Sequence, residues 1–552
     1  MIDFQLPDGV YRHWRLEIAA PVAQVFMQVD EAGGLFDGYA LKLNSYDLGV
    51  DIELADIVQR LRFEHPDVRV VVLRSAQERV FCAGANIRML ASASHALKVN
   101  FCKFTNETRN AIEAAGTDSG QHWVCAVEGS CAGGGYELAL ACDEILLLDD
   151  ASSGVSLPEV PLLAVLPGTG GLTRVTDKRN VRRDIADVFC TVEEGVRGEK
   201  ALRWGLVDAV AKRSRFDDEL AEITTKWSEQ STRSSSDDAT AQPLVALTRD
   251  NSDPDSIRYS TVAVTIDRAA GRAEIMITGP TTAPPTAIGQ WQTATAEAWL
   301  FTVARELDDA LLHLRFNELD IGLLVFRSTG DPQQVLAHEQ FLLSRRDNWL
   351  ANEVLQYWKR VLKRVDLTSR TLVALVENGS CFAGMLAELV FAVDRSYMMA
   401  GEFEELDPPP ATLSLNETNF AHLPMSNGLS RLATRFWGHD STLAKVQALQ
   451  GSPLDAAAAD EAGLVTFAFD DIDWEDEVRI FLEERASFSA DALTAMEANL
   501  RFAGPETMET RIFGRLTAWQ NWVFQRPNAV GENGALQRYG SGKRADFDRN
   551  RV

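Results

Sequence analysis

The sequence contains no uninterrupted apolar run of about 18 residues, the length that a membrane-spanning helix needs. The opening residues Met1-Ile2-Asp3-Phe4-Gln5 also lack the basic and apolar regions of a secretory signal peptide. The seven cysteines are an odd number without any Cys-x-x-Cys spacing, and the eight histidines are scattered. Neither a disulfide framework nor a metal site is therefore expected, and we expect a cytoplasmic protein.

Positive charge is also scarce, because 54 basic residues face 80 acidic ones and the net charge is -26. This balance argues against a nucleic-acid partner and against binding to an anionic membrane surface. Gly168–Gly171 is the segment most similar to a phosphate loop, but it has neither the lysine of a P-loop nor a dinucleotide fingerprint. We read it as a helix-packing segment, and we expect no metal, flavin or nicotinamide cofactor.

At 552 residues the chain exceeds one ordinary domain, for which about 100–200 residues are typical. Apolar runs that predict strands alternate with periodic segments that predict helices, and this alternation indicates an α/β fold. The predicted strands are Val22–Val29, Val68–Leu73, Trp123–Val127 and Glu144–Leu148, and the main predicted helices are Asp51–Arg62 and Lys98–Ala115.

Motifs of the first half recur in the second half in the same order, offset by 250 to 258 residues. Cys381-Phe382-Ala383-Gly384 repeats Cys131-Ala132-Gly133-Gly134, and Leu423–Arg431 repeats Leu166–Arg174. We therefore predict a catalytic domain at 1–231, a linker at 232–256, a related domain at 257–504 and a helical tail at 505–552. At these offsets Glu137 falls on Ala387 and Glu159 on Asn416, so the second domain is expected to be degenerate and structural.

The most informative stretch is Cys131–Leu140, in which three glycines separate an apolar run from a helix-forming run. Glycines allow a tight turn, and a helix that begins there directs its unpaired amides and positive dipole end at a ligand. Glu137 lies in the first turn of that helix. Amides and a carboxylate at one point suit chemistry on a carbonyl oxygen, although a first-turn Glu also simply complements the helix dipole.

Five ordered features give the chain a resemblance to the crotonase (enoyl-CoA hydratase) superfamily. They are Leu43-Asn44, Phe81–Ile87, Gly133–Glu137, Pro158-Glu159 and Leu166–Arg174. The resemblance covers roughly Val22–Trp227 well and Val262–Gly504 weakly. It implies two tandem domains of crotonase-type ββα spiral fold and an acyl-CoA thioester as substrate, with CoA as part of the substrate.

The same resemblance implies roles for individual residues. The amides of Ala85 and Gly134 correspond to the oxyanion hole, and Glu137 and Glu159 fall on the two acid/base positions. Family positions that contact CoA are matched by Leu43, Ala83, Asn86 and Ile87, although the usual Asp is Asn86 here. Which glutamate is the acid stays open.

Cys102 is a further candidate, because the segment after the first oxyanion motif lines the acyl pocket in this superfamily. Its neighbours Lys103 and Arg109 could favour a thiolate. The alternative is that Cys102 is a small core hydrophobe. Asn44, Asn106 and Asn110 are either polar pocket groups or turn and helix-surface residues.

Segments outside the shared motifs, among them Trp519–Gly531 and Phe547–Val552, are similar to one ring-cleaving branch of the superfamily. That similarity implies a lyase of aerobic benzoate degradation that opens 2,3-epoxybenzoyl-CoA and releases formate. Two alternatives stay open: an enoyl-CoA hydratase or isomerase for another acyl-CoA, and a non-catalytic CoA-thioester binding protein. Because the repeat already supplies an intramolecular neighbour, we expect a homodimer rather than a trimer.

Overall fold

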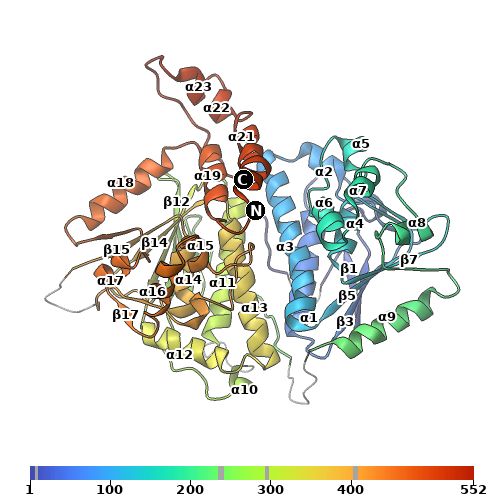
Figure 1. Cartoon of the computed structure of the whole chain (residues 1–552), viewed down its shortest axis with the longest axis horizontal. Helices are drawn as coiled ribbons and strands as arrows, with labels where there is room; N and C mark the ends of the chain where they lie inside the picture. Colours follow the sequence, from blue (N-terminus) through green and yellow to red (C-terminus); the bar gives the residue numbers. More distant parts are fainter. Residues whose placement is uncertain (7–9, 234–240, 292–297, 402–407) are drawn as a thin grey trace. The chain divides into compact units, whose positions relative to one another are not determined.

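The computed structural model describes residues 1–6, 10–233, 241–291, 298–401 and 408–552 (Figure 1). The chain forms two compact units, divided between Ala246 and Leu247. We call residues 6–246 with 348–353 the N-terminal unit, and residues 1–5, 247–347 and 354–552 the C-terminal unit. Part of the predicted linker, residues 234–240, lies outside the described residues, and residues 505–552 belong to the C-terminal unit.

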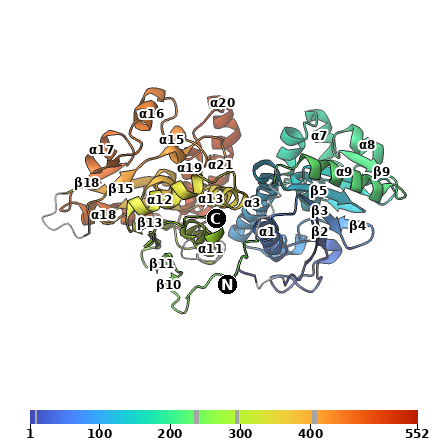
Figure 2. The same cartoon turned by 90° about the horizontal axis from the view of Figure 1, so that it is seen from below.

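The N-terminal unit is built on a six-stranded sheet in which only the first pair of strands is antiparallel. In spatial order the strands are β1 (Trp14–Ala19), β2 (Val22–Met27), β3 (Val70–Ser75), β5 (His122–Val127), β7 (Glu144–Leu148) and β9 (Ala209–Ala211). Figure 2 shows β2, β3 and β5 side by side. The β-branched central strands were predicted from the sequence, whereas β1 was not.

Helices cover the faces of this sheet. Because side chains alternate along a strand, Val70 and Val72 face helix α9 (Phe216–Gln230), whose Phe216 completes the same apolar cluster. The opposite face is covered by α3 (His95–Ser119), which packs on α1 (Leu48–Phe63).

Three short parallel strands form a second sheet that sequence analysis did not predict. They are β4 (Val80–Cys82), β6 (Ser130–Ala132) and β8 (Gly154–Ser156). Each strand is followed by a short helix, namely α2 (Ile87–Ser92), α4 (Gly134–Ala141) and α5 (Glu159–Leu163). Since the carboxyl ends of parallel strands meet at one edge of a sheet, the three loops that carry the predicted site residues converge there.

The C-terminal unit repeats this arrangement, as the sequence repeat predicts. Its seven strands lie in the order β10 (Ser256–Arg258), β11 (Val262–Asp267), β12 (Arg272–Thr278), β13 (Leu323–Thr329), β14 (Thr371–Val376), β15 (Arg395–Met399) and β18 (Phe467–Phe469). The pairs from β12 to β18 are parallel. Helix α18 (Trp474–Ala486) packs on β13, β14 and β15 in the position that α9 has on the other sheet.

The C-terminal unit also contains the helices α12 (Pro332–Leu343), α14 (Gly384–Ala392), η3 (Glu417–Asn419), α15 (Arg431–Arg435) and α19 (Ala490–Leu500). The C-terminal segment contains α20 (Met508–Thr510), η4 (Arg511–Leu516) and α21 (Thr517–Val523), drawn in red in Figure 1. Within the described ranges, no helix has the length and apolar character required to cross a membrane.

Candidate active site

The turn between β6 and α4 sets up the first predicted amide. Gly133 adopts φ +53°, a conformation that strongly favours glycine, and its N–H donates to the carbonyl of Ser156 at 2.9 Å. The next residue, Gly134, is the first residue of α4, and its N–H therefore has no acceptor within the helix. That amide is available to a ligand at the helix N-terminus.

The second predicted amide is presented by a bridge between Ala85 and Tyr46. Tyr46 donates to Gly84 O at 3.0 Å and accepts from Asn86 N at 2.8 Å. In a parallel bridge of this kind the N–H of Ala85 points away from Tyr46. A methyl group on Gly84 would lie 3.0 Å from Gly134 N, so the segments that carry the two amides are in direct contact.

Glu137 is buried and both of its carboxylate oxygens accept hydrogen bonds. Gly171 N donates to Oε1 at 2.7 Å, and the Thr169 hydroxyl donates to Oε2. Gly171 is the first residue of α6 (Gly171–Thr173) and Thr169 lies two residues before it, so the segment that we read as helix packing in fact holds this carboxylate. A methyl group on Gly171 would lie 2.6 Å from Cγ of Glu137.

Glu159 begins α5 and faces the same glycine turn, since a methyl group on Gly133 would lie 2.9 Å from its Oε1. Its Oε2 is buried and has no hydrogen-bond partner in the described part of the chain. Burial and the nearby charge of Glu137 raise the pKa of Glu159 to about 7. One carboxyl that changes protonation state near neutral pH thus lies beside a second one, which suits acid–base chemistry.

The structure does not favour a thiolate at Cys102, one of the two roles left open for it. Burial and the Glu137 charge raise the pKa of Cys102 to about 11, and Arg109 opposes them only in part. The Arg109 guanidinium is directed instead to Tyr46 and to the Gly134 carbonyl. Cys102 nevertheless lies near Glu137, and its catalytic role stays a prediction.

The residues predicted to contact CoA divide into two groups. Leu43 and Ile87 expose 55% and 56% of their surface, and Ala83 is also exposed. Asn86 is buried: its side chain caps α2 through Met89 N at 3.0 Å and donates to Ala40 O. An amide thus performs the capping for which Asp is also suited, and a charge is not required there.

Of the predicted pocket amides, Asn44 is a buried structural residue that binds the Met27 and Phe81 carbonyls. Asn106 donates to Gly168 O, and Asn110 accepts from Arg174, so both brace the loop that holds Glu137. Thr169 and Gly171, which hold Glu137, were not predicted as site residues. The only sequence signal for them was the glycine-rich loop itself.

The C-terminal unit corrects the alignment of the two halves. Asp143 and Asp394 each accept a hydrogen bond from the strand before them, from Trp123 N and Leu372 N respectively, at 2.8 Å. Gly133 and Gly384 have nearly equal φ, +53° and +50°. Equivalent residues of the two units are therefore 251 positions apart from the turn glycine to the end of the helix, and Glu137 corresponds to Glu388.

The expected correspondence of Glu137 to Ala387 is wrong, because the loop between β14 and α14 is longer than the loop between β5 and the turn before α4. Ser156 of β8 pairs with Ala132, and Ser414 makes the corresponding bridge with Ala383. Ser156 and Ser414 are 258 positions apart, so Glu159 corresponds to Glu417 rather than to Asn416. Glu417 is exposed, whereas Glu159 is buried. The acidic residues are present in both units, but their surroundings differ.

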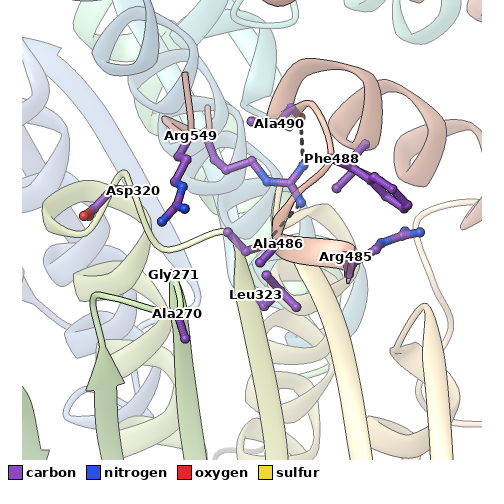
Figure 3. Close-up of a pocket in the computed structure, with 12 residues that line it drawn as sticks. Ala270, Gly271, Asp320, Leu323, Arg485, Ala486, Phe488, Ala490 and Arg549 are labelled. Atoms are coloured by element: carbon purple, nitrogen blue, oxygen red, sulfur yellow. Dashed lines mark hydrogen bonds between the residues drawn. The ribbon is translucent and has the colours of Figure 1, made fainter. Parts of the chain in front are cut away.

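The C-terminal unit also has a small pocket, shown in Figure 3. It is lined by Gly271, Asp320, Arg485, Arg549 and buried Arg551, among others. Arg551 is bound by protein groups, donating to Ala490 O at 2.8 Å and to Thr494 Oγ1 at 3.0 Å. Asp320 is the one carboxylate among the described lining residues, so this pocket lacks a pair of acid–base groups.

Comparisons with known proteins show which proteins this chain is similar to. The family model described as enoyl-CoA hydratase/isomerase matches residues 41–250. The chain is 52% identical to benzoyl-CoA-dihydrodiol lyase of Aromatoleum evansii over 553 residues, which covers 100% of this chain and 98% of that protein. It is 28% identical over 190 residues to carnitinyl-CoA dehydratase of Proteus mirabilis (strain HI4320), covering 33% of this chain and 66% of that one.

Among solved structures, enoyl-CoA hydratase from Bacillus anthracis matches with 26% identity and a TM-score of 0.33, over 39% of this chain and 76% of that one. The full-length identity extends through both units and includes the C-terminal segment. The chain belongs to the enoyl-CoA hydratase/isomerase family, the crotonase superfamily.

Proposed function

We propose that this protein is a hydrolytic carbon–carbon lyase that converts 2,3-epoxybenzoyl-CoA and two waters into 3,4-dehydroadipyl-CoA semialdehyde and formate, in aerobic benzoate degradation. The observation that carries the proposal is the pair of buried carboxyls, Glu137 and Glu159, beside the amides of Ala85 and Gly134. The full-length relative supports it, because adding one water to the epoxide gives a benzoyl-CoA dihydrodiol, the compound in that relative's name.

In the first step the thioester carbonyl binds at the amides of Ala85 and Gly134. Glu159, which is protonated up to about neutral pH, donates a proton to the epoxide oxygen. Glu137, held by two donors, takes a proton from the attacking water. Charge that the conjugated ring places on the carbonyl oxygen is stabilised by the two amides, each worth about 2.7–4 kcal/mol.

In the second step the bond between the two oxygen-bearing carbons of the diol breaks and its electrons enter the conjugated double bonds, which gives two enols. Each enol gives up its hydroxyl proton and takes a proton on carbon to become an aldehyde, and one of these aldehydes is attached to the carbon next to the thioester. Water adds to this aldehyde, and cleavage of the adjacent C–C bond releases formate. The electron pair stays on the carbon next to the thioester, and the same two amides stabilise the resulting enolate before it is protonated.

Product analysis tests the proposal. The purified protein is incubated with 2,3-epoxybenzoyl-CoA or with its dihydrodiol in ¹⁸O-labelled water, and formate and acyl-CoA products are identified by mass spectrometry. We expect formate from both compounds, with label in the formate. Hydration without formate would identify an ordinary hydratase, and binding without any product would identify a CoA-thioester binding protein.

The proposed reaction consumes only water and is completed by acid–base groups, so we expect it to need no metal, flavin or nicotinamide. Dialysis against a chelator should leave the rate of formate release unchanged. A cytoplasmic location fits this proposal, because the seven free cysteines would stay reduced there.

We also propose a homodimer. Apolar side chains of the C-terminal helices are exposed in the single chain, including Met508 at 75% and Phe513 at 72%. Exposed apolar clusters of this kind commonly mark protein interfaces. Light scattering should give twice the mass of one chain, and Phe513→Glu should shift the protein towards a monomer.

A further inference from the structure

We propose that Tyr46 and Arg109 are positioning residues that hold the amides of Ala85 and Gly134 at the spacing needed to bind one oxygen atom. This inference rests on the proposed function, because it assigns a role to side chains behind the thioester-binding amides. The two amides come from separate loops, after β4 and after β6. A contact that joins both loops would fix their spacing.

Tyr46 makes that contact with both loops. Its backbone bonds to Gly84 O and Asn86 N, on either side of Ala85. Its hydroxyl lies against the other loop, since a methyl group on Gly134 would lie 2.0 Å from that oxygen. One residue thus touches the chain on both sides of the oxyanion site.

Arg109 holds this hydroxyl in place. The Nη2 atom of Arg109 donates to the Tyr46 hydroxyl and to the Gly134 carbonyl, both at 2.9 Å, and Nη1 donates to Thr105 O at 3.1 Å. Arg109 is 1% exposed, so these bonds are protected from water and are stronger than surface ones. A buried cation hydrogen-bonded to the residue that carries the amide also favours negative charge on the bound oxygen.

The charge of Arg109 is balanced within the same cluster. Asp51 is buried and accepts a hydrogen bond from the Thr105 hydroxyl, and its negative charge favours the charged form of Arg109. The remaining guanidinium nitrogen, Nε, has no partner in the described part of the chain. Two of the three guanidinium nitrogens, Nη1 and Nη2, therefore set the positions of Tyr46, Gly134 and α3.

The test measures carbonyl polarisation separately from turnover. Benzoyl-CoA labelled with ¹³C at the thioester carbonyl is bound to the protein, and the C=O stretching frequency is read by difference infrared spectroscopy. In the wild type we expect a downward shift on binding. In Tyr46→Phe we expect at least half of that shift to be lost and kcat to fall about 10–30-fold, part of the loss for removal of a whole oxyanion donor, with Kd within threefold.

Tyr136→Phe is the matched control. Tyr136 lies on α4 and is fully buried, and its hydroxyl donates to Leu206 O at 2.6 Å. The control should lower Tm but keep the carbonyl shift and kcat. Arg109→Lys, which keeps the charge but has fewer donors, should give an intermediate shift even if Tyr46→Phe folds poorly.

The outcomes separate the two proposals. A wild-type carbonyl shift that persists in Tyr46→Phe and Arg109→Lys, or that is lost equally in Tyr136→Phe, would overturn the positioning role alone. If the wild type shows no shift at all, the amides do not bind the carbonyl and the proposed function fails as well.

Discussion

Helices α4 and α14 begin in the same way, yet their first amides meet different partners. In the N-terminal unit the N–H of Gly134 faces the open end of the helix, beside Glu159. In the C-terminal unit the equivalent N–H, that of Met385, donates to Oε2 of the buried Glu339 at 2.8 Å. A side chain from α12 occupies the place where the proposed function puts a substrate oxygen.

The glutamates at the fourth position after the turn glycine differ in the same sense. Glu137 is held by the hydroxyl of Thr169 and the N–H of Gly171, both neutral donors. Glu388 is held by Asn419 at 2.8 Å and by the cation Arg431 at 2.9 Å. Because Asn419 and the buried Arg431 both bind Glu388, this glutamate stabilises the C-terminal unit, whereas its counterpart Glu137 is available for chemistry.

The largest expected difference between the units is therefore in activity after Glu→Gln replacement. Glu137→Gln should lower kcat for formate release about 10³-fold, within the range of a lost general base, with little change in Tm. Glu388→Gln should leave kcat within threefold and lower Tm, because Arg431 loses one of its two charged partners, the other being Asp366. Equal loss of activity in both variants would contradict the division into an active and a structural unit.

The second comparison takes one glycine from each turn: Gly134, the first residue of α4, and Gly384, the counterpart of Gly133. In Gly134→Ala the added methyl group would displace the Tyr46 hydroxyl, and we expect kcat to fall about 10²-fold, as for loss of one oxyanion donor. In Gly384→Ala the methyl group would lie 1.8 Å from Oε2 of Glu339, at φ +50°. That variant should be destabilised by about 1–3 kcal/mol and should keep its kcat while folded. Loss of kcat in folded Gly384→Ala would place Glu339 in the catalytic pathway.

The sequence predicted the architecture further than it predicted the site. Strands β3, β5 and β7 are continuous β-branched or apolar runs, and the glycine turn before α4 is a strong local signal, so both were found. The three-residue strands β4, β6 and β8 are too short for any periodicity. Only their pairing in space brings Ala85, Gly134 and Glu159 to one edge.

The partners of the site residues were also out of reach of the sequence. Tyr46 and Arg109 are 63 positions apart and meet only because α3 packs against the glycine loop. Glu388 was missed because a single offset between the two halves of the sequence does not account for an insertion in a loop. The equivalent hydrogen bonds of Asp143 and Asp394 show which residues of the two units correspond. Glu339 had no motif at all.

The third comparison concerns stability against pH, because each unit contains a carboxyl whose pKa is raised from 4.5 to about 7, Glu159 and Glu339. Between those values the folded state binds more protons than the unfolded state, so stability falls as pH rises from about 4.5 to 7 and is then constant. At pH 8 each Glu→Gln variant should be more stable than the wild type, by at most about 3 kcal/mol. Below pH 4.5 this difference should vanish.

Activity distinguishes the two carboxyls. Glu159→Gln should remove activity at every pH, whereas Glu339→Gln should keep the wild-type pH profile, in which kcat/KM falls above about pH 7 as Glu159 loses its proton. Thermal unfolding and kcat/KM are measured at pH 4, 6 and 8. A wild-type profile that instead rises through pH 7 would make Glu159 the base and reverse the proposed roles.

The smallest expected effects compare Cys102 with Cys381, whose pKa values burial raises to about 11 in both units. At pH 7.5 less than about one thiol in 10³ is then ionised, so both should react with iodoacetamide more slowly than an ordinary thiol does. We expect Cys102→Ala to lower kcat less than tenfold and Cys381→Ala not at all, because an un-ionised thiol can position water or substrate but is a weak base. A loss above 10²-fold in Cys102→Ala, with an alkylation midpoint well below pH 11, would show that this thiol ionises for catalysis although burial and the Glu137 charge raise its pKa.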